Sequence, residues 1–84
     1  MSVLDEIAAE RRRQIEKGYT AEHDDQHVDG ELADAAAAYA TGYAGWWPWS
    51  LDTWKPADSR RQLIIAAAFL MAEIERIDRK EGKK

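Results

Sequence analysis

The feature that most constrains the fold is an apolar repeat in the last third of the chain. Between residues 57 and 79, large apolar side chains recur every three or four positions. They are Leu63, Ile64, Ala67, Leu70, Met71, Ile74 and Ile77. This spacing places them on one face of an α-helix, because a strand would need strict alternation. The repeat predicts a helix over residues 57–79 that buries this face, with Pro56 at a helix start that tolerates proline.

Two shorter helices are predicted upstream. Residues 3–17 begin after Ser2, a suitable N-cap with Asp5 three positions later, and end before Gly18. The apolar positions of this segment are Leu4, Ile7, Ala8, Arg11 and Ile15. Residues 30–41 follow Asp29 as an N-cap and end before Gly42. Residues 18–28 between them are polar and are expected to form a loop.

The predicted fold class is therefore all-α. No segment alternates with the period of a strand, and 84 residues provide for only one core. We expect a single compact three-helix domain over residues 1–84, with a Trp-rich loop before the long third helix and a polar tail over residues 79–84 that frays. A domain of this size has a small core, which favours a homo-oligomer.

Composition narrows the classes of function. The chain has no cysteine, which excludes disulfide frameworks, thiolate metal sites and cysteine nucleophiles. A net charge of −4 disfavours binding to a nucleic acid polymer. The longest apolar run, residues 63–72, is about half of what spans a bilayer, and no signal peptide is recognisable. We expect a cytoplasmic protein that does not bind membranes.

Arg11 is unusual because it lies on the apolar side of the first helix. Its aliphatic stem could pack while its charged head reaches solvent. Alternatively, its guanidinium could be held inside to meet an anion. The residues alone leave both interpretations open.

The segment "HDDQH" supplies candidate functional groups in His23, Asp24 and His27. If helical, the two histidines are one turn apart and could reach one metal ion, with nearby acids as further ligands. The same residues could contact a ligand, or could cap helices and pair with arginines. All three interpretations remain open at this point.

Glu31 and Asp34 form an E-x-x-D pair whose carboxylates share one helix face. This pair resembles half of the metal site of the MazG-like all-α nucleotide pyrophosphohydrolases. That family carries an E-E-x-x-E set on an upstream helix, whereas this chain offers Glu6 and Glu10. The resemblance implies a possible magnesium-dependent hydrolase that uses Glu10, Glu31 and Asp34, although the family pattern is incomplete.

All four tryptophans lie within nine residues, in a loop that contains two prolines. They are Trp46, Trp47, Trp49 and Trp54. We expect at least two of them to cover the end of the helical core, because indole rings bury large apolar areas. An aromatic loop can also stack on a nucleobase or anchor another protein.

The start of the third predicted helix has the features of a nucleotide pocket. Trp54 and Lys55 precede it, and Arg60 and Arg61 lie in its first turn. Helix N-termini and arginine side chains favour phosphate, and a flat ring favours a base. Arg11 is a further candidate for phosphate, Tyr19, Tyr39 or Tyr43 for stacking, and His23 and Asp24 for base edges. A contact between subunits would use the same residue types.

Nearly the whole chain resembles a group of small phage and prophage accessory proteins. The resemblance is carried by "ERRRQIEKGYTAEHDDQHVDGELADAAAAYA" and "WPWSLDTWKPADSRRQLIIAAAFLMAEIERIDR". It implies a protein that acts in the host cytoplasm, and by analogy one of the oligomeric sponges that hold host immune nucleotide signals without cleaving them. Such a sponge needs no cofactor. The alternatives are the magnesium-dependent hydrolase and a protein inhibitor whose tryptophan loop binds a host defence enzyme.

Overall fold

The computed structural model describes residues 2–82, and every regular element in this range is helical. The main helices are α1 (Val3–Glu16), α3 (Glu31–Thr41) and α4 (Ser59–Lys80). A single-turn helix, α2 (Ala21–Asp25), and two 3-10 turns, η1 (Ala44–Trp46) and η2 (Leu51–Thr53), occupy the connections. The all-α prediction is confirmed. The end of the polar tail expected to fray, residues 83–84, lies outside the described residues.

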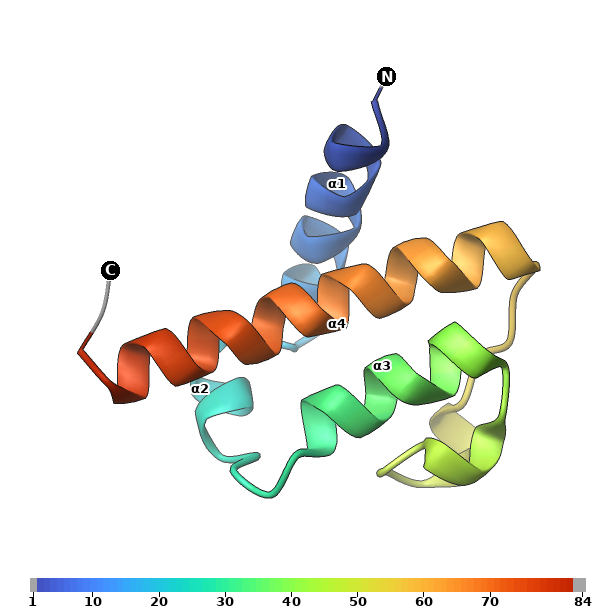
Figure 1. The fold of residues 1–84 in the computed structure, drawn as a ribbon. Helices are drawn as coiled ribbons and strands as arrows, with labels where there is room; N and C mark the ends of the chain where they lie inside the picture. The colour runs from blue at the N-terminus through green and yellow to red at the C-terminus, as the bar shows by residue number, and fades with distance from the viewer. Residues whose placement is uncertain (1, 83–84) are drawn as a thin grey trace.

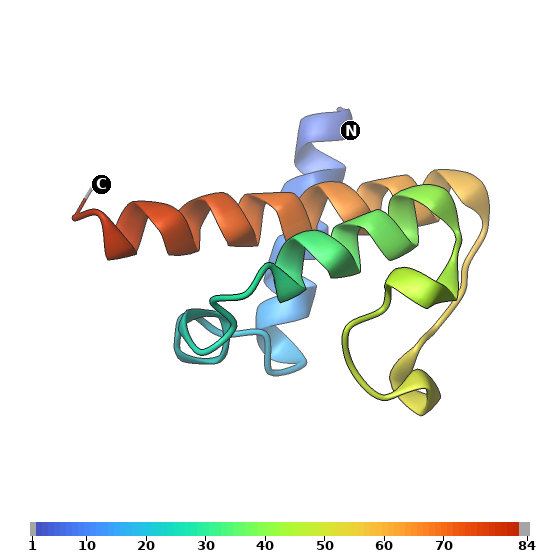
Figure 2. The same ribbon diagram turned by 60° about the horizontal axis from the view of Figure 1, so that its bottom comes forward.

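The long helix α4 is the spine of the molecule (Figure 1). α3 runs antiparallel beside it, and α1 crosses it at a steep angle on another side (Figures 1 and 2). The segment between α3 and α4 folds back below the helix pair as a wide loop (Figure 2). None of the helices within residues 2–82 is long and apolar enough to cross a lipid bilayer.

Helix boundaries follow local capping. The Ser2 hydroxyl accepts a hydrogen bond from the Asp5 amide, and the Asp5 carboxylate accepts one from the Ser2 amide. α4 begins later than predicted because the Asp58 carboxylate caps it by accepting from the Arg61 amide. The prediction of Asp29 as the N-cap of α3 is wrong, because Gly30 takes that position with a φ of 87°.

The loop predicted over residues 18–28 contains α2, which the sequence analysis missed. The Thr20 hydroxyl caps this turn by accepting a hydrogen bond from the His23 amide. A one-turn helix shows no apolar periodicity, so only its cap could have indicated it.

The core lies between α3 and α4. Its buried members are mostly alanines together with a few large side chains: Leu32, Ala35, Ala36, Ala38, Tyr39, Trp47, Ala66, Phe69 and Ala72. The alanine side chain occupies little volume between two helix backbones, so α3 and α4 can approach closely. The aromatic rings fill the remaining volume.

The predicted core face of α4 is largely wrong. Leu63, Leu70, Ile74 and Ile77 are exposed, and the buried side of α4 carries Ile64, Ala66, Ala68, Phe69 and Ala72. α4 thus has two apolar faces, and the alanine-rich one matches the alanines of α3. Periodicity identifies apolar faces but does not say which one a neighbouring helix covers.

The apolar side predicted for α1 is also wrong in part, since Leu4 and Ile15 are exposed. The buried positions of α1 are Glu10, Arg11 and Gln14. These polar side chains are buried because α4 and α2 supply partners for them, as described below.

Candidate functional site

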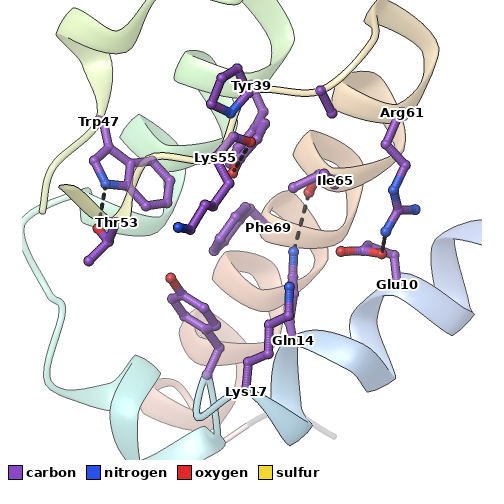
Figure 3. Close-up of a pocket in the computed structure, with 13 residues that line it drawn as sticks. Glu10, Gln14, Lys17, Tyr39, Trp47, Thr53, Lys55, Arg61, Ile65 and Phe69 are labelled. Carbon is purple, nitrogen blue, oxygen red and sulfur yellow. Dashed lines mark hydrogen bonds and ion pairs between the residues drawn. The ribbon is translucent and has the colours of Figure 1, made fainter. Parts of the chain in front are cut away.

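A cavity of about 490 Å³ opens between α1, the end of α3, the aromatic loop and the first half of α4 (Figure 3). We call it the α1–α4 pocket. Its lining residues are Glu10, Gln14, Lys17, Tyr19, Tyr39, Trp47, Thr53, Lys55, Pro56, Ala57, Arg61, Ile65 and Phe69. The volume lies within the range typical of small-molecule sites.

Aromatic rings form one wall of the pocket. Tyr39 and Trp47 meet edge to face with ring centroids 5.6 Å apart, and Tyr19 meets Phe69 edge to face at 5.3 Å. The Trp47 indole N–H donates to the Thr53 hydroxyl at 3.0 Å, which fixes the orientation of the ring. The wall therefore offers apolar aromatic surface to a ligand.

Gln14, which lines the pocket, carries an unpaired polar atom. Its side chain is only 3% exposed, and its amide nitrogen donates to the Ile65 carbonyl oxygen at 3.4 Å (Figure 3). Its amide oxygen, Oε1, is buried and has no hydrogen-bond partner. A buried acceptor without a donor costs about 1–3 kcal/mol. A ligand that carries an N–H or O–H group could supply the missing donor.

Three cations and one carboxylate line the pocket. The Arg61 guanidinium donates to Glu10, which also pairs with Arg13. Within residues 2–82, the amino groups of Lys17 and Lys55 form no ion pair or hydrogen bond. Lys55 extends from the aromatic loop into the space between Trp47 and Phe69 (Figure 3). The pocket thus has an excess of positive charge beside its aromatic wall.

The two tyrosine hydroxyls at the pocket stay protonated at neutral pH. Burial raises the pKa of Tyr19, and the charge of Asp24 adds to this effect. Burial also raises the pKa of Tyr39, whose hydroxyl donates to the Lys55 carbonyl oxygen at 3.0 Å. This hydrogen bond ties the aromatic loop to α3 and positions Lys55.

A smaller recess of about 270 Å³ adjoins the pocket. The two cavities share Lys17, Tyr19 and Thr53, and the recess adds Gly18, His23 and Trp49. The indole N–H of Trp49 is buried there without an acceptor. The lining residues of the two cavities therefore include one unpaired buried acceptor, on Gln14, and one unpaired buried donor, on Trp49.

Four of the residues predicted to contact a ligand line the pocket: Tyr19, Tyr39, Lys55 and Arg61. Gln14, Lys17, Trp47 and Phe69 were not predicted as binding residues from the sequence. Gln14 and Phe69 come from helices that are distant along the chain, so no local motif connects them. The high density of tryptophan was the one signal that pointed to Trp47.

Seven other predicted residues lie outside the pocket lining, and three of these belong to the aromatic loop or the start of α4. Trp54 packs against Tyr39 with ring centroids 4.6 Å apart and supports the aromatic wall from behind. Tyr43 is exposed. Arg60 points outward and forms a bidentate ion pair with Glu6 at 2.8 and 2.7 Å. This pair attaches α1 to the start of α4.

Arg11 and Asp24 form a buried ion pair at 3.1 Å. Arg11 also donates to the Tyr19 carbonyl oxygen and to Glu75 on α4. Asp24 is completely buried and has a second partner in the His23 ring at 3.0 Å. Of the two interpretations of Arg11, the structure shows the guanidinium held inside, where the anion it meets is Asp24.

The His27 ring nitrogen Nδ1 lies 3.2 Å from the Glu31 carboxylate, and the ring packs on His23 and Trp49. Glu31 also accepts a hydrogen bond from the Asp29 amide. These hydrogen bonds lower the pKa of Glu31, the largest effect coming from its own backbone amide. The histidines of "HDDQH" therefore have carboxylate and aromatic partners within the chain.

The carboxylates of the hydrolase alternative do not come together. Glu10 pairs with arginines at the pocket, whereas Glu31 pairs with His27 beyond α2. Over residues 2–82, no group of three histidine, aspartate or glutamate side chains is arranged to hold a metal ion.

Comparison with models of known protein families gave no match, and comparisons with curated proteins and with solved structures gave none either.

Proposed function

We propose that the protein binds a nucleotide in the α1–α4 pocket and sequesters it. The observation that carries this proposal is the buried amide oxygen of Gln14, which lacks a donor in a pocket that also holds two unpaired lysines and an aromatic wall. A nucleotide combines the three complementary features: an N–H donor on its base, a flat ring and an anionic phosphate.

Each group of residues has a role in this proposal. The base lies against Trp47 and Phe69, since stacking on aromatic rings suits any base. An N–H group on its edge donates to Gln14 Oε1. The phosphates bind Lys17 and Lys55, whose ammonium groups form charge-assisted hydrogen bonds with phosphate oxygens.

The biological part of the proposal comes from the resemblance to phage accessory proteins. A small phage protein that holds a nucleotide would deprive a host defence enzyme of its signal, such as a cyclic oligonucleotide or an ADP-ribose derivative. The protein would act in the host cytoplasm. In this role it must bind tightly and release its ligand unchanged.

The test is a thermal-shift and calorimetry screen against AMP, ATP, a cyclic dinucleotide and ADP-ribose, with and without magnesium. We expect one class to raise the melting temperature without magnesium and to be recovered intact after denaturation. Recovery of cleaved nucleotide would contradict sequestration and support a hydrolase. Absence of any shift would contradict nucleotide binding.

A matched pair of variants locates the site. Lys55→Ala should weaken binding about 10- to 100-fold, because a hydrogen bond to a charged group contributes about 1.5–3 kcal/mol. Lys80→Ala removes the same charge at the far end of α4, outside the pocket lining, and should leave the dissociation constant unchanged. Equal effects of the two substitutions would indicate nonspecific attraction of an anion.

A further inference from the structure

A row of exposed apolar side chains follows α4 along one side. Leu63, Leu70, Ile74 and Ile77 are 55%, 49%, 59% and 37% exposed, and Ala67 completes the row. We call this row the α4 seam. Its spacing alternates between four and three residues, which is the heptad pattern by which two helices pack along a shared line. Contiguous apolar patches of this kind mark interaction surfaces.

The seam is on the side of α4 that the rest of the chain leaves uncovered. α3 packs on the side that carries Phe69, and α1 is attached through Arg61, Ile65 and Glu75. At 100° per residue, the seam is directed away from both groups. The α1–α4 pocket uses Arg61, Ile65 and Phe69, so it opens on a different side of α4 from the seam.

We propose that the seam packs against the same seam of a second copy of this chain, with the two α4 helices antiparallel. A twofold dimer needs a surface that is complementary to itself. Reversing the part of the seam from residue 63 to residue 74 about its midpoint, between residues 68 and 69, exchanges position 63 with 74 and position 67 with 70. Each of these four apolar residues then opposes an apolar residue of the partner. Ile77 opposes position 60, where it meets the aliphatic stem of an arginine.

Charges beside the seam select the antiparallel arrangement. Arg60 and Asp78 are separated by about five helical turns, so they lie on the same flank at opposite ends of α4. Asp78 forms no ion pair or hydrogen bond through its side chain within residues 2–82. Arg60 uses its two terminal nitrogens for Glu6, and its Nε remains available. Antiparallel packing places each Asp78 beside Arg60 of the partner subunit, whereas parallel packing would leave these two side chains at opposite ends of the dimer.

Sedimentation equilibrium over a concentration series tests the dimer. The wild-type chain should approach twice its mass of 9.6 kDa. Replacing Leu70 and Ile74 with glutamine should shift it to the single-chain mass, with helicity by circular dichroism unchanged because both side chains are exposed and glutamine favours helices. Leu51→Gln is the matched control. It removes an equally exposed leucine from η2, outside the seam, and should leave the dimer intact.

Two outcomes would overturn the proposal. If the wild-type chain keeps the single-chain mass at every concentration, the seam does not bind a second copy and would instead bind a different protein. A seam variant that remains dimeric would place the contact elsewhere. Nucleotide binding by the seam variant is measured in parallel. Because the pocket and the seam are separate, binding should persist in the monomer, so either proposal can fail without the other.

The absence of cysteine allows a direct test of orientation. Chains carrying Leu63→Cys and chains carrying Ile74→Cys are oxidised separately and then as a mixture. Disulfides need close Cα atoms, and antiparallel packing brings only the mixed pair together. In a parallel dimer the mixed pair would be about 16 Å apart along the axis. We expect cross-linking mainly in the mixture. Efficient cross-linking of either variant alone would overturn the antiparallel arrangement.

Discussion

At the scale of single residues, the buried ion pair between Arg11 and Asp24 connects three elements. Asp24 belongs to α2 and Arg11 to α1, and Arg11 reaches Glu75 on α4 as well. The pair therefore holds the short helix α2 against the longer ones. It also positions Tyr19, whose carbonyl oxygen accepts from Arg11 and whose ring lines the pocket.

Removing Asp24 should be strongly destabilising. Asp24→Ala leaves the Arg11 guanidinium buried with one partner fewer, and the loss of one member of a buried pair costs about 3–5 kcal/mol. Asp25→Ala is the control. It removes a largely exposed pair with Arg79 and should cost about 0–1 kcal/mol. Urea unfolding measures both, and equal losses would contradict the structural role of Asp24.

Glu31 makes the free energy of unfolding depend on pH in the acid range. Hydrogen bonds from its own amide, the Asp29 amide and His27 lower its pKa in the folded chain below the ordinary value of 4.5. The folded state therefore binds fewer protons than the unfolded state in this range. The contribution is complete above about pH 4.5 and is lost as the pH falls through the folded-state pKa.

Glu31→Gln should therefore flatten the decline of the unfolding free energy below pH 4.5, because the substituted side chain no longer titrates. Chemical unfolding at a series of pH values measures this decline. Glu22→Gln changes an exposed carboxylate on α2 and serves as the control. A decline in the Glu31→Gln variant as steep as that of the wild type would contradict this role of Glu31.

At the scale of elements, the aromatic loop is a folded part of the core. Two 3-10 turns give it local structure, and Trp47 packs against Tyr39 and Phe69. The prediction that at least two tryptophans cover the core is confirmed, since Trp47 is buried and Trp49 and Trp54 pack against the same cluster. The composition of the loop could show that its aromatic rings must pack against other residues. It could not show which of the rings are buried.

Two adjacent tryptophans should differ sharply in their contribution to stability. Trp47 is 7% exposed, and Trp46 is 50% exposed. Trp47→Ala should cost about 3–5 kcal/mol, as for other buried aromatic residues. Trp46→Ala should change the unfolding free energy by about 0.5 kcal/mol or less. Thermal and chemical unfolding of the two variants measure these changes. A larger loss of unfolding free energy for Trp46→Ala than for Trp47→Ala would contradict the packing of the loop.

α4 shows where sequence analysis succeeds and where it fails. Its existence and approximate ends could be predicted, because the apolar repeat is a local signal. The buried face could not, because α4 is apolar on two sides and the choice depends on the alanines of α3. Leu70 was expected in the core for this reason and is exposed instead.

At the scale of the whole molecule, α4 separates two surfaces. One side contributes to the α1–α4 pocket, and another carries the seam proposed to bind a second copy. The pocket could be predicted only in part. Lys55 and Arg61 adjoin the tryptophan cluster in the sequence, but Gln14 reaches them only because α1 crosses α4. Such a crossing depends on tertiary packing and leaves no local motif.

The central claim is that Gln14 Oε1 accepts a hydrogen bond from a bound nucleotide. Calorimetry of the Gln14→Leu variant tests this claim most directly. The substitution removes the unpaired buried acceptor and keeps much of the side-chain volume, so the melting temperature of the free protein should stay the same or rise. Binding of the nucleotide found in the screen of AMP, ATP, cyclic dinucleotide and ADP-ribose should weaken about tenfold or more. Unchanged affinity in a folded Gln14→Leu variant would contradict the account.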